Sequence, residues 1–403
     1  MLSDTVFILG LLLKLFSVYY IFIGLFVFLR QKKRARAAPS VRFAVVLPAR
    51  NEEKVIGQLI ESLKLQDYPD ELFDIYVAVN NCTDDTAAVA EAHGARVFEC
   101  RDVKCKGDVL EQCLGELMDE DLGYDAFCVF DSDNVVDRRF LAECNDAFMS
   151  GSRVVKGRNE AKNAYDSWVS GCYAIYFRMG YLLYSRPRSA IGLSAKMIGT
   201  GFAVHRNVLE ELGGWHTVSL TEDIEFAEQC AERGIRIDWA PDAVTYEEHP
   251  NSFSVSLTQR KRWCSGIVEV GRLRLGKLLR SMKGGRRALK ADCVMYHLNP
   301  FAQALAFIPA AISIVLIVLP PVLPNEGLSL VGLVAAAYVG GCLGALAITI
   351  FTKTWNRRLL KSILTYPIFL ASWLPLQVLA IFHTTRTWEQ IDHTRDISLS
   401  EVA

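Results

Sequence analysis

The chain of 403 residues lacks an excess of either charge, a paired-cysteine motif and a phosphate-binding loop. Its formal net charge of −1 gives no global basic field, so no nucleic-acid partner is expected. None of the eleven cysteines forms a C-x-x-C pair, and the seven histidines show no metal-ligand spacing near them. This pattern disfavours a disulfide framework or a structural zinc and favours reduced thiols in the cytosol. The absence of G-x-x-x-x-G-K-[ST] leaves a P-loop NTPase without support.

Apolar residues are abundant instead. Hydrophobic residues make up 51 % of the chain and charged residues 22 %, and the mean hydropathy is +0.20. This composition is too apolar for a disordered chain and more apolar than that of an ordinary soluble enzyme. The length leaves room for one sizeable catalytic domain and additional segments.

An apolar run at residues 6–29 is interrupted by a single charge, Lys14. It is long enough to cross a hydrocarbon core of about 30 Å. A signal peptide is the alternative, because Ala35-Arg36-Ala37 resembles a cleavage site. However, the basic cluster at residues 31–36 follows the run instead of preceding it. This order favours a membrane anchor in residues 1–30 and a cytosolic position for the chain that follows.

Three further apolar stretches lie at residues 294–323, 328–351 and 363–382. Basic residues precede the first stretch and lie between the second and third, as expected for cytosolic loops beside anionic membrane lipid. The third stretch contains Pro367 and Pro375, so it is either a span or a re-entrant segment. We therefore expect a multi-pass protein of the cell membrane. Its parts are a soluble segment at residues 40–255, basic interfacial helices at 256–292, membrane helices at 293–384 and a tail at 385–403, with the side of the tail and the oligomeric state left open.

The segment at residues 40–255 has the pattern of an α/β domain. Short apolar strands are predicted at residues 43–47, 73–79 and 126–130. A helical pattern opens near residue 51, with Asn51 as its cap and with Val55, Leu59 and Leu63 among the residues on one face. Strands that alternate with helices favour a mainly parallel sheet, which binds ligands at the carboxyl ends of its strands.

Three motifs between residues 131 and 263 contain side chains suited to catalysis or ligand binding. Asp131-Ser132-Asp133 follows a strand directly and offers hard oxygen ligands for Mg²⁺ or Mn²⁺ with a substrate diphosphate, although a solvated loop has the same pattern. Thr221-Glu222-Asp223 begins a helix, with Thr221 as its N-cap, and either acid could instead be a general base. The run at residues 258–263 contains three basic residues and Trp263. It suits an interfacial helix, a clamp on a diphosphate and a sugar, or both.

Together and in this order, the motifs resemble those of the membrane-integrated family 2 glycosyltransferases, which include synthases of chitin oligosaccharides, hyaluronan, poly-N-acetylglucosamine and cellulose. The resemblance covers nearly the whole chain. It implies a cytosolic GT-A fold flanked by transmembrane helices. The motifs that carry it are Pro48-Ala49-Arg50-Asn51-Glu52, the loop at residues 80–86, Lys106-Gly107, Asp131-Ser132-Asp133, Thr221-Glu222-Asp223 and Gln259-Arg260-Lys261-Arg262-Trp263.

The resemblance also implies roles for individual residues. Asp223 would be the general base, and Asp131 and Asp133 would hold Mg²⁺ or Mn²⁺. The acceptor would be bound by Glu222, Gly199, Thr200, Gly201 and Trp263. The nucleotide sugar would be bound by Ala49, Asn51, Glu52, Asn80, Lys106, Asp131, Gln259, Arg260, Arg262 and Trp263.

The implied reaction is the inverting transfer of a sugar from a nucleotide diphosphate, with UDP expected, to a glycan acceptor at the cytosolic membrane face. Processive polysaccharide synthesis is one form of this reaction. The alternative is the transfer of one sugar to a lipid acceptor, as in ceramide glucosyltransferase-like enzymes. Asn80 and Asn81 replace the acidic residue that many family members carry in the nucleotide loop, and the chain is short for a polymer channel.

Overall fold

The structure is a computed structural model that describes residues 2–31, 33–120, 122–318, 324–383 and 397–402. Its described part contains one eight-stranded sheet with the order β3-β2-β1-β4-β7-β6-β8-β5. The strands are β1 (Phe43–Ala49), β2 (Phe73–Asn80), β3 (Arg96–Cys100), β4 (Ala126–Val129), β5 (Val135–Val136), β6 (Val154–Ala161), β7 (Phe202–His205) and β8 (Ile237–Glu247).

The sheet is mixed. Strand β1 pairs in parallel with β2 and β4, β2 with β3, and β6 with β8. Strand β7 runs antiparallel to both β4 and β6, and the short β5 runs antiparallel to β8. The predicted parallel arrangement is therefore correct for six strands, which all run in one direction and end at the same edge. The reversed β7 lies between the two parallel groups.

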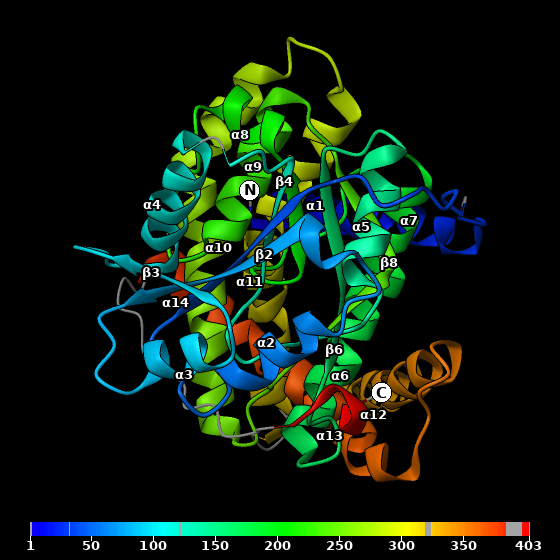
Figure 1. Ribbon diagram of the computed structural model, residues 1–403. Helices are drawn as coiled ribbons and strands as arrows, with labels where there is room; N and C mark the ends of the chain where they lie inside the picture. The colour runs from blue at the N-terminus through cyan, green and yellow to red at the C-terminus, as the bar shows by residue number, and fades with distance from the viewer. Residues whose placement is uncertain (1, 32, 121, 319–323, 384–396, 403) are drawn as a thin grey trace.

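Successive residues of β1 face opposite sides of the sheet, as the period of a strand requires. Val45 and Leu47 pack against one layer of helices, formed by α2 (Ile56–Lys64), α3 (Thr86–Ala92) and α5 (Phe140–Met149). Ala44 and Val46 pack against the other layer, formed by α4 (Lys106–Asp119), α8 (Arg206–Leu212) and α9 (Glu222–Arg233) (Figure 1). The sheet is thus the middle of three layers.

The three predicted strands correspond to β1, β2 and β4, but the first predicted helix begins later than expected. Helix α2 starts at Ile56, and Val55 is its N-cap without a side-chain hydrogen bond. Asn51 therefore lies before the N-cap, in a left-handed conformation with a φ of 57°, and the prediction that it caps this helix is wrong. The predicted apolar face is confirmed, since Val55, Leu59 and Leu63 are at most 2 % exposed.

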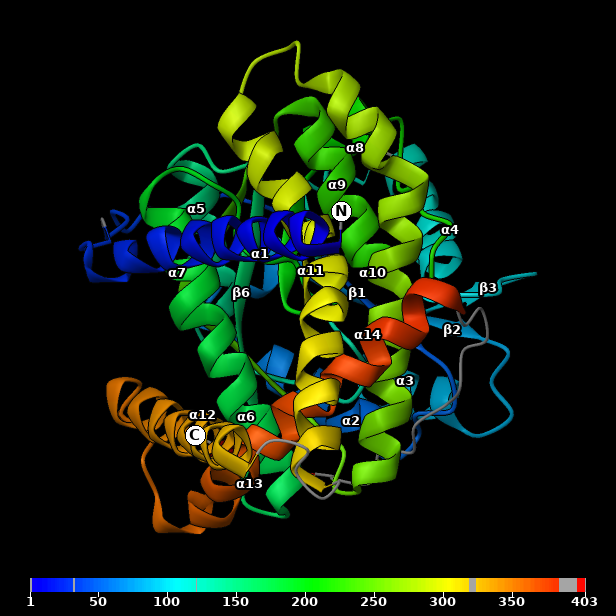
Figure 2. The same ribbon diagram turned by 180° about the vertical axis from the view of Figure 1, so that it is seen from behind.

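Long helices pack behind the sheet. Helices α10 (Phe253–Ser281), α11 (Arg287–Val318) and α14 (Trp373–Phe382) contact one another, and α10 also packs on α9. Figure 2 shows these helices side by side, with α1 (Leu2–Leu25) lying across α11. The remaining helices are α6 (Trp168–Gly180), α7 (Arg186–Ala190), α12 (Pro324–Phe351), α13 (Leu360–Ala371) and α15 (Leu399–Val402), with short helical turns η1 (Phe26–Phe28), η2 (Asp70–Leu72), η3 (Tyr181–Ser185) and η4 (Arg357–Leu359).

Among the described residues, two helical stretches are long and apolar enough to cross a membrane: Val331–Phe351 and Arg357–Phe382. Only 11 % of the first is buried, so it is not a core helix. The third predicted stretch is divided at Ser372 into α13 and α14. The described part of the N-terminal run contains a shorter apolar helix, Leu13–Phe28. Residues 319–323 and 384–396, which belong to the predicted membrane segment and tail, lie outside the described residues.

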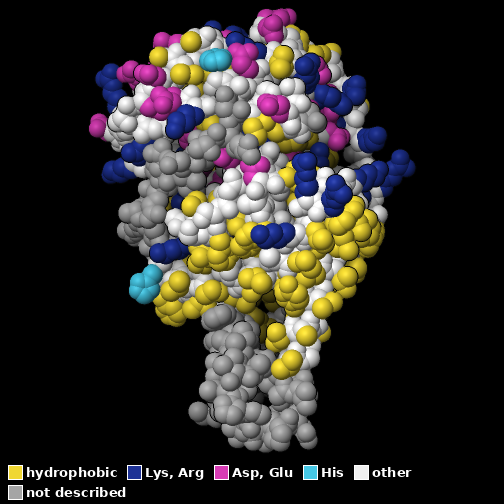
Figure 3. Space-filling model, turned by 90° about the horizontal axis from the view of Figure 1, so that it is seen from below, with side chains coloured by type: hydrophobic (Ala, Val, Ile, Leu, Met, Phe, Trp, Pro, Cys, Tyr) yellow, Lys and Arg dark blue, Asp and Glu magenta, His cyan; other side chains and the backbone are white. Residues whose placement is uncertain are grey.

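Hydrophobic side chains gather on one part of the surface. Seen from below, they form a band, whereas acidic side chains gather on another part of the same view (Figure 3). Leu333, Val339 and Leu343 on α12 are between 53 % and 64 % exposed. Helix α12 therefore presents an apolar face that the described chain does not cover.

Candidate active site

A cavity of about 300 Å³ opens at the edge where the parallel strands end. Ala49 ends β1, Asn80 ends β2, Asp131 lies two residues beyond the end of β4 and Glu247 ends β8, and all four line it. Helix α9 brings its N-terminus to the opposite wall. This position agrees with the expectation that ligands bind at the carboxyl ends of the strands.

Twelve of the sixteen candidate site residues line this cavity, although they come from distant parts of the sequence. They are Ala49, Glu52, Asn80, Lys106, Asp131, Asp133, Gly199, Glu222, Asp223, Gln259, Arg262 and Trp263. The fold therefore brings the D-x-D motif, the acids of α9 and the Gln259–Trp263 run to one place.

Lys106 connects the two acidic groups. Its Nζ lies 2.5 Å from Oδ1 of Asp131 and 3.2 Å from Oε1 of Glu222, and it also donates to the carbonyl oxygen of Gly199. Burial lowers the pKa of Lys106, but the two carboxylates outweigh burial and raise this pKa above its ordinary value. The ammonium is thus charged and holds the end of β4 close to the start of α9.

Gly199, a predicted acceptor contact, lines the cavity beside this cluster. A Cβ at this position would lie 3.3 Å from both Oε1 of Glu222 and Nζ of Lys106. Any larger residue would therefore press on the acid–lysine cluster, and a glycine leaves the space open.

Asp223 lies in the first turn of α9 and lines the cavity. Burial, followed by repulsion from Glu222, raises the pKa of Asp223 from 3.8 to about 7, although Lys106 acts in the opposite direction. A carboxylate with a pKa near neutrality can accept a proton and release it again at physiological pH. This is the property that a general base requires, and Asp223 remains the candidate for that role.

Asp133 is the more buried of the two D-x-D acids, being 5 % exposed, and its Oδ2 accepts from the backbone N–H of Glu248 at 2.9 Å. Glu247 faces the same cavity, and burial together with Asp133 and Asp131 raises its pKa to about 8. This crowding of carboxylates is unfavourable without a cation. Oxygen donors of this kind fit Mg²⁺ or Mn²⁺, with Asp131 and Asp133 as the candidate ligands.

Sequence reasoning missed His249, which lines the same cavity. Its ring stacks against both Tyr173 and Phe177, with ring centroids 4.9 Å away in each case. Its Nε2 lies 3.6 Å from Oε1 of Glu247 and has no hydrogen-bond partner in the described structure. Burial lowers the pKa of His249 to about 3, although Asp133 acts in the opposite direction. The imidazole is therefore neutral at pH 7 and can offer a lone pair to a metal held by the D-x-D acids.

Arg260 does not reach the cavity, so its predicted contact with the diphosphate is wrong. Its guanidinium is fully buried and donates from Nη1 to the carbonyl of Phe369 at 3.1 Å and to Oγ of Ser372 at 2.8 Å. Residues two apart on a helix point about 200° away from each other, so Arg260 and Arg262 cannot face the same side. Gln259, Arg262 and Trp263 share the face that lines the cavity.

Thr200 and Gly201 lie beneath the cavity and do not line it, which corrects their prediction as acceptor contacts. Thr200 is fully buried, and its Oγ1 accepts from the backbone N–H of Asp131 at 3.0 Å. Gly201 has a φ of 63°, and a Cβ there would lie 2.5 Å from the side chain of Thr245. Both residues support the end of β4 from below.

Asn51 and Thr221 also have structural positions. Oδ1 of Asn51 accepts from the backbone N–H of Thr83 at 2.7 Å and joins the loops after β1 and β2, so Asn51 does not line the cavity. Thr221 occupies the N-cap position of α9, but its side chain makes no capping hydrogen bond. Its Oγ1 instead lies close to Gly266 on α10, where a Cβ would be only 2.4 Å away.

A mixed sheet with a D-x-D pair at one strand end, facing an acidic helix N-terminus across a cavity, is the arrangement that the resemblance to GT-A glycosyltransferases implies. A family model described as "Glycosyltransferase like family 2" matches residues 39–266, more than half of the chain. The chain belongs to this family and is a family 2 glycosyltransferase.

Curated relatives agree with this family. The chain is 27 % identical over 238 residues to probable glycosyltransferase YdaM of Bacillus subtilis, covering 56 % of this chain and 55 % of that protein. It is 25 % identical over 330 residues to beta-monoglucosyldiacylglycerol synthase of Trichormus variabilis, covering 77 % and 66 %. The chain thus spans about half to two thirds of the length of these curated relatives.

The fold is similar to that of mannosyltransferase PcManGT from Pyrobaculum calidifontis, solved in complex with GDP-Man and Mn²⁺. The TM-score is 0.64 at 18 % sequence identity, and the match covers 95 % of this chain and 99 % of that one. At 18 % identity, this similarity concerns the fold of the two chains.

Proposed function

We propose that the protein is an inverting glycosyltransferase that moves one sugar from a nucleotide diphosphate sugar to a hydroxyl group of a membrane lipid. The observation that carries this proposal is the composition of the two cavity walls. One wall is formed by Lys106 and the acids at the strand ends. The other is formed by aromatic and aliphatic side chains of helices α6, α10, α11 and α14, namely Tyr176, Phe177, Trp263, Ile267, Tyr296 and Trp373.

The charged wall would bind the donor. Ala49, Glu52 and Asn80 lie at the ends of the first two strands, where the nucleoside would sit, and we take the nucleotide to be UDP. Asp131 and Asp133 would hold the divalent cation against the diphosphate, and Gln259 and Arg262 would contact the diphosphate from α10. A bound Mg²⁺ or Mn²⁺ would stabilise the negative charge of the leaving nucleotide.

Asp223 would deprotonate the acceptor hydroxyl, which then attacks the anomeric carbon from the face opposite the nucleotide. The bond to the diphosphate oxygen breaks as the new glycosidic bond forms, so an α-linked donor gives a β-glycoside. Lys106 and Arg262 would support the charge of the departing diphosphate, and Glu222 would lie beside the acceptor. Asp223 is suited to its role because its pKa of about 7 leaves it partly ionised at neutral pH.

The apolar wall favours a lipid acceptor over the glycan acceptor that the family resemblance first implies. Trp263 stacks with Trp373 at a ring-centroid distance of 6.1 Å, and Tyr176 stacks with Trp373 at 5.2 Å. These rings belong to α10, α14 and α6, which adjoin the apolar helices α12 and α13. The synthases of beta-monoglucosyldiacylglycerol among the relatives also support a lipid acceptor.

The proposal includes the membrane. Helices α12, α13 and α14 would be embedded in it and α1 would anchor the N-terminus, with the catalytic domain on the cytosolic side. The apolar stretches Val331–Phe351 and Arg357–Phe382 support this arrangement by length and composition. A cavity at the base of these helices could receive a lipid hydroxyl without the lipid leaving the bilayer.

A donor screen tests the proposal. The purified chain in lipid vesicles containing diacylglycerol is incubated with Mn²⁺ and radiolabelled UDP- and GDP-sugars, and the products are extracted with chloroform and weighed by mass spectrometry. We expect one chloroform-soluble product carrying a single sugar, and no product from Asp223→Asn. Water-soluble products of many lengths would contradict the lipid acceptor and favour a glycan polymer.

A further inference from the structure

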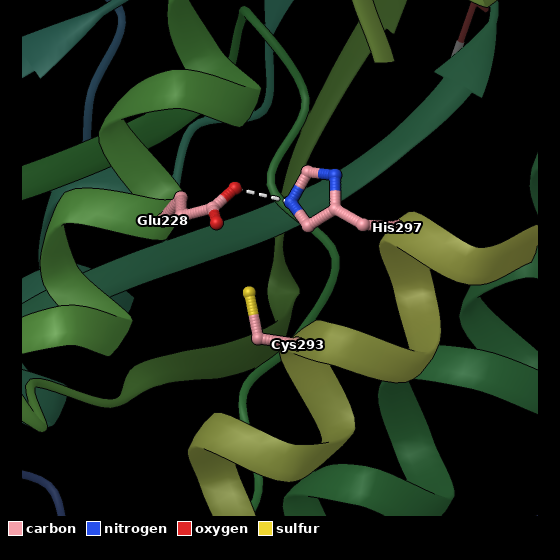
Figure 4. A group of neighbouring side chains, drawn as sticks. All are labelled: Glu228, Cys293 and His297. Carbon is pink, nitrogen blue, oxygen red and sulfur yellow. Dashed lines mark ion pairs between the residues drawn. The ribbon is translucent and has the colours of Figure 1, made fainter. Parts of the chain in front are cut away.

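A second cluster of ligand-type side chains lies between α9 and α11, outside the catalytic cavity. Glu228 comes from α9, and Cys293 and His297 come from successive turns of α11. Figure 4 shows the three side chains pointing toward one another across the gap between the two helices. One ligand atom of each residue lies within 4.8 Å of the corresponding atom of the other two.

The polar groups of this cluster are buried without sufficient partners. Glu228 is 0 % exposed and His297 is 3 % exposed. They form an ion pair with each other, but neither carboxylate oxygen and neither ring nitrogen has a hydrogen-bond partner in the described structure. Buried polar atoms nearly always have a hydrogen-bond partner, so a group of buried atoms without one indicates a missing ligand. The carboxylate oxygens of Glu228 and one ring nitrogen of a neutral His297 carry lone pairs that can bind a cation.

We propose that Glu228, Cys293 and His297 bind a Zn²⁺ ion. Thiolate, imidazole and carboxylate are the three ligand types that Zn²⁺ takes in proteins, and a thiolate distinguishes it from Mg²⁺ and Mn²⁺, which favour oxygen. Cys293 and His297 are four residues apart and so lie on one face of α11, as two ligands from one helix must. The catalytic cation and this zinc would therefore be bound at two sites of different chemistry.

The surroundings leave room for a fourth ligand. A cavity of about 50 Å³ adjoins the cluster and is lined by all three residues. This volume admits a water molecule, which would complete a tetrahedral set. Asp292 also lines the cavity, but it is paired with Arg188 at 3.0 Å. The protein ligands are thus three in number.

The position of the site suggests what the ion would do. Glu228 and Asp223 lie on the same helix, with Asp223 in its first turn at the catalytic cavity. Ile224 and Tyr296 line both the zinc-side cavity and the catalytic cavity. An ion that joins α9 to α11 would fix the helix that carries Asp223 against the helix bundle. The residues are positioning residues, since none of the three lines the catalytic cavity.

The Cys293-x-x-x-His297 spacing is present in the sequence, which corrects the earlier inference that no histidine stands at metal-ligand spacing from a cysteine. These two ligands alone do not identify a site. The third, Glu228, lies on α9, far earlier in the chain, so the sequence does not show that it belongs to the same cluster. Packing of α9 on α11 completes the set.

Metal analysis of the full-length chain tests the proposal without any activity assay. The protein is expressed with zinc in the medium, purified in detergent, passed over a chelating resin and analysed by mass spectrometry for metals. We expect about one zinc per chain, and less than about a tenth of that in Cys293→Ser and His297→Ala. Cys342→Ser and His216→Ala, which alter a cysteine and a histidine outside the cluster, serve as controls and should retain zinc.

Two further measurements keep the test decisive if a variant folds poorly. Wild-type protein loaded with Co²⁺ should show a thiolate-to-cobalt charge-transfer band, and Asp133→Ala should keep its zinc because the D-x-D site is separate. A wild-type chain with less than about a tenth of a zinc would overturn the proposal. Zinc that persists in both cluster variants, or that disappears with Asp133→Ala, would equally overturn it.

Discussion

The carboxyl group of Asp223 carries the chemical step of the proposed reaction, so its titration should govern the pH dependence. Its pKa is raised to about 7, and only the ionised form accepts a proton. We expect kcat/KM to fall about tenfold for each pH unit below this pKa and to level off above it. A fall in kcat/KM that begins only near pH 4, where an ordinary aspartate titrates, would contradict this assignment.

Replacement of the same residue gives the matching mutational prediction. Asp223→Asn keeps the shape of the side chain but removes the base, so kcat should fall by about 10²- to 10⁴-fold. Donor binding, measured by calorimetry with UDP and Mn²⁺, should stay within about twofold of wild type. A loss of donor affinity as large as the loss in kcat would show that Asp223 binds the donor instead of acting as the base.

Asp133 is the second residue on which the proposed reaction depends. Asp133→Ala removes one candidate metal ligand, so Mn²⁺-dependent UDP binding should weaken by more than about 100-fold while the thermal unfolding temperature remains near that of wild type. Asp242→Ala alters an exposed aspartate on β8 and serves as the control. Unchanged UDP affinity in Asp133→Ala would show that Asp133 does not hold the metal.

On the scale of secondary-structure elements, helix α10 presents two neighbouring arginines to different surroundings. Arg260 is buried beneath α13 and α14, whereas Arg262 lines the cavity. Arg260→Met should lower the free energy of unfolding by about 1–3 kcal/mol, because the carbonyl of Phe369 loses its partner, and it should leave the KM for the donor unchanged. Thermal unfolding in detergent measures this loss.

Arg262→Met is the matched control for Arg260→Met, since the same residue change is made two positions away. It should raise the KM for the donor by about tenfold or more with little change in stability. Equal effects of the two substitutions on KM would show that both arginines contact the donor, against the helical geometry.

The elements also show what could be predicted. The strands β1, β2 and β4 and the D-x-D motif were predictable because apolar runs and their polar ends are local in sequence. The burial of Arg260 was predictable in principle from helical periodicity, since Arg262 and Trp263 already fix the face of α10. The position of His249 was not predictable, because the rings it stacks against, Tyr173 and Phe177, come from α6, far away in the sequence.

Antiparallel pairing of β7 could not be predicted either. Phe202–His205 is a short apolar segment, and nothing in its four residues specifies its direction. Its place between β4 and β6 follows from the packing of the whole sheet. That placement puts Thr200 and Gly201 beneath Asp131 instead of in the cavity, which is why their predicted role as acceptor contacts was wrong.

On the scale of the whole molecule, α12 has an apolar face that would be costly in water and suits a bilayer. If this helix is embedded, Val339→Arg, near the middle of the stretch Val331–Phe351, should reduce the share of the chain found in washed membranes. A charge at this depth costs about 2.5–3.5 kcal/mol. Alkaline carbonate extraction followed by immunoblotting measures the retained share.

Val218→Arg is the control for this substitution, because Val218 is 76 % exposed but precedes α9 in the catalytic domain. It should leave the membrane fraction unchanged. Release of the wild-type chain by carbonate, without detergent, would mean that α12 covers another protein surface instead of spanning a bilayer.

The stereochemistry of the product shows whether the sugar is transferred with inversion. The purified chain in vesicles is given an α-linked UDP-sugar and diacylglycerol, and the anomeric proton of the glycolipid is observed by nuclear magnetic resonance. The proposed reaction predicts a β-glycoside, since Asp223 would activate the hydroxyl on the face opposite the diphosphate. An α-linked glycolipid would contradict it.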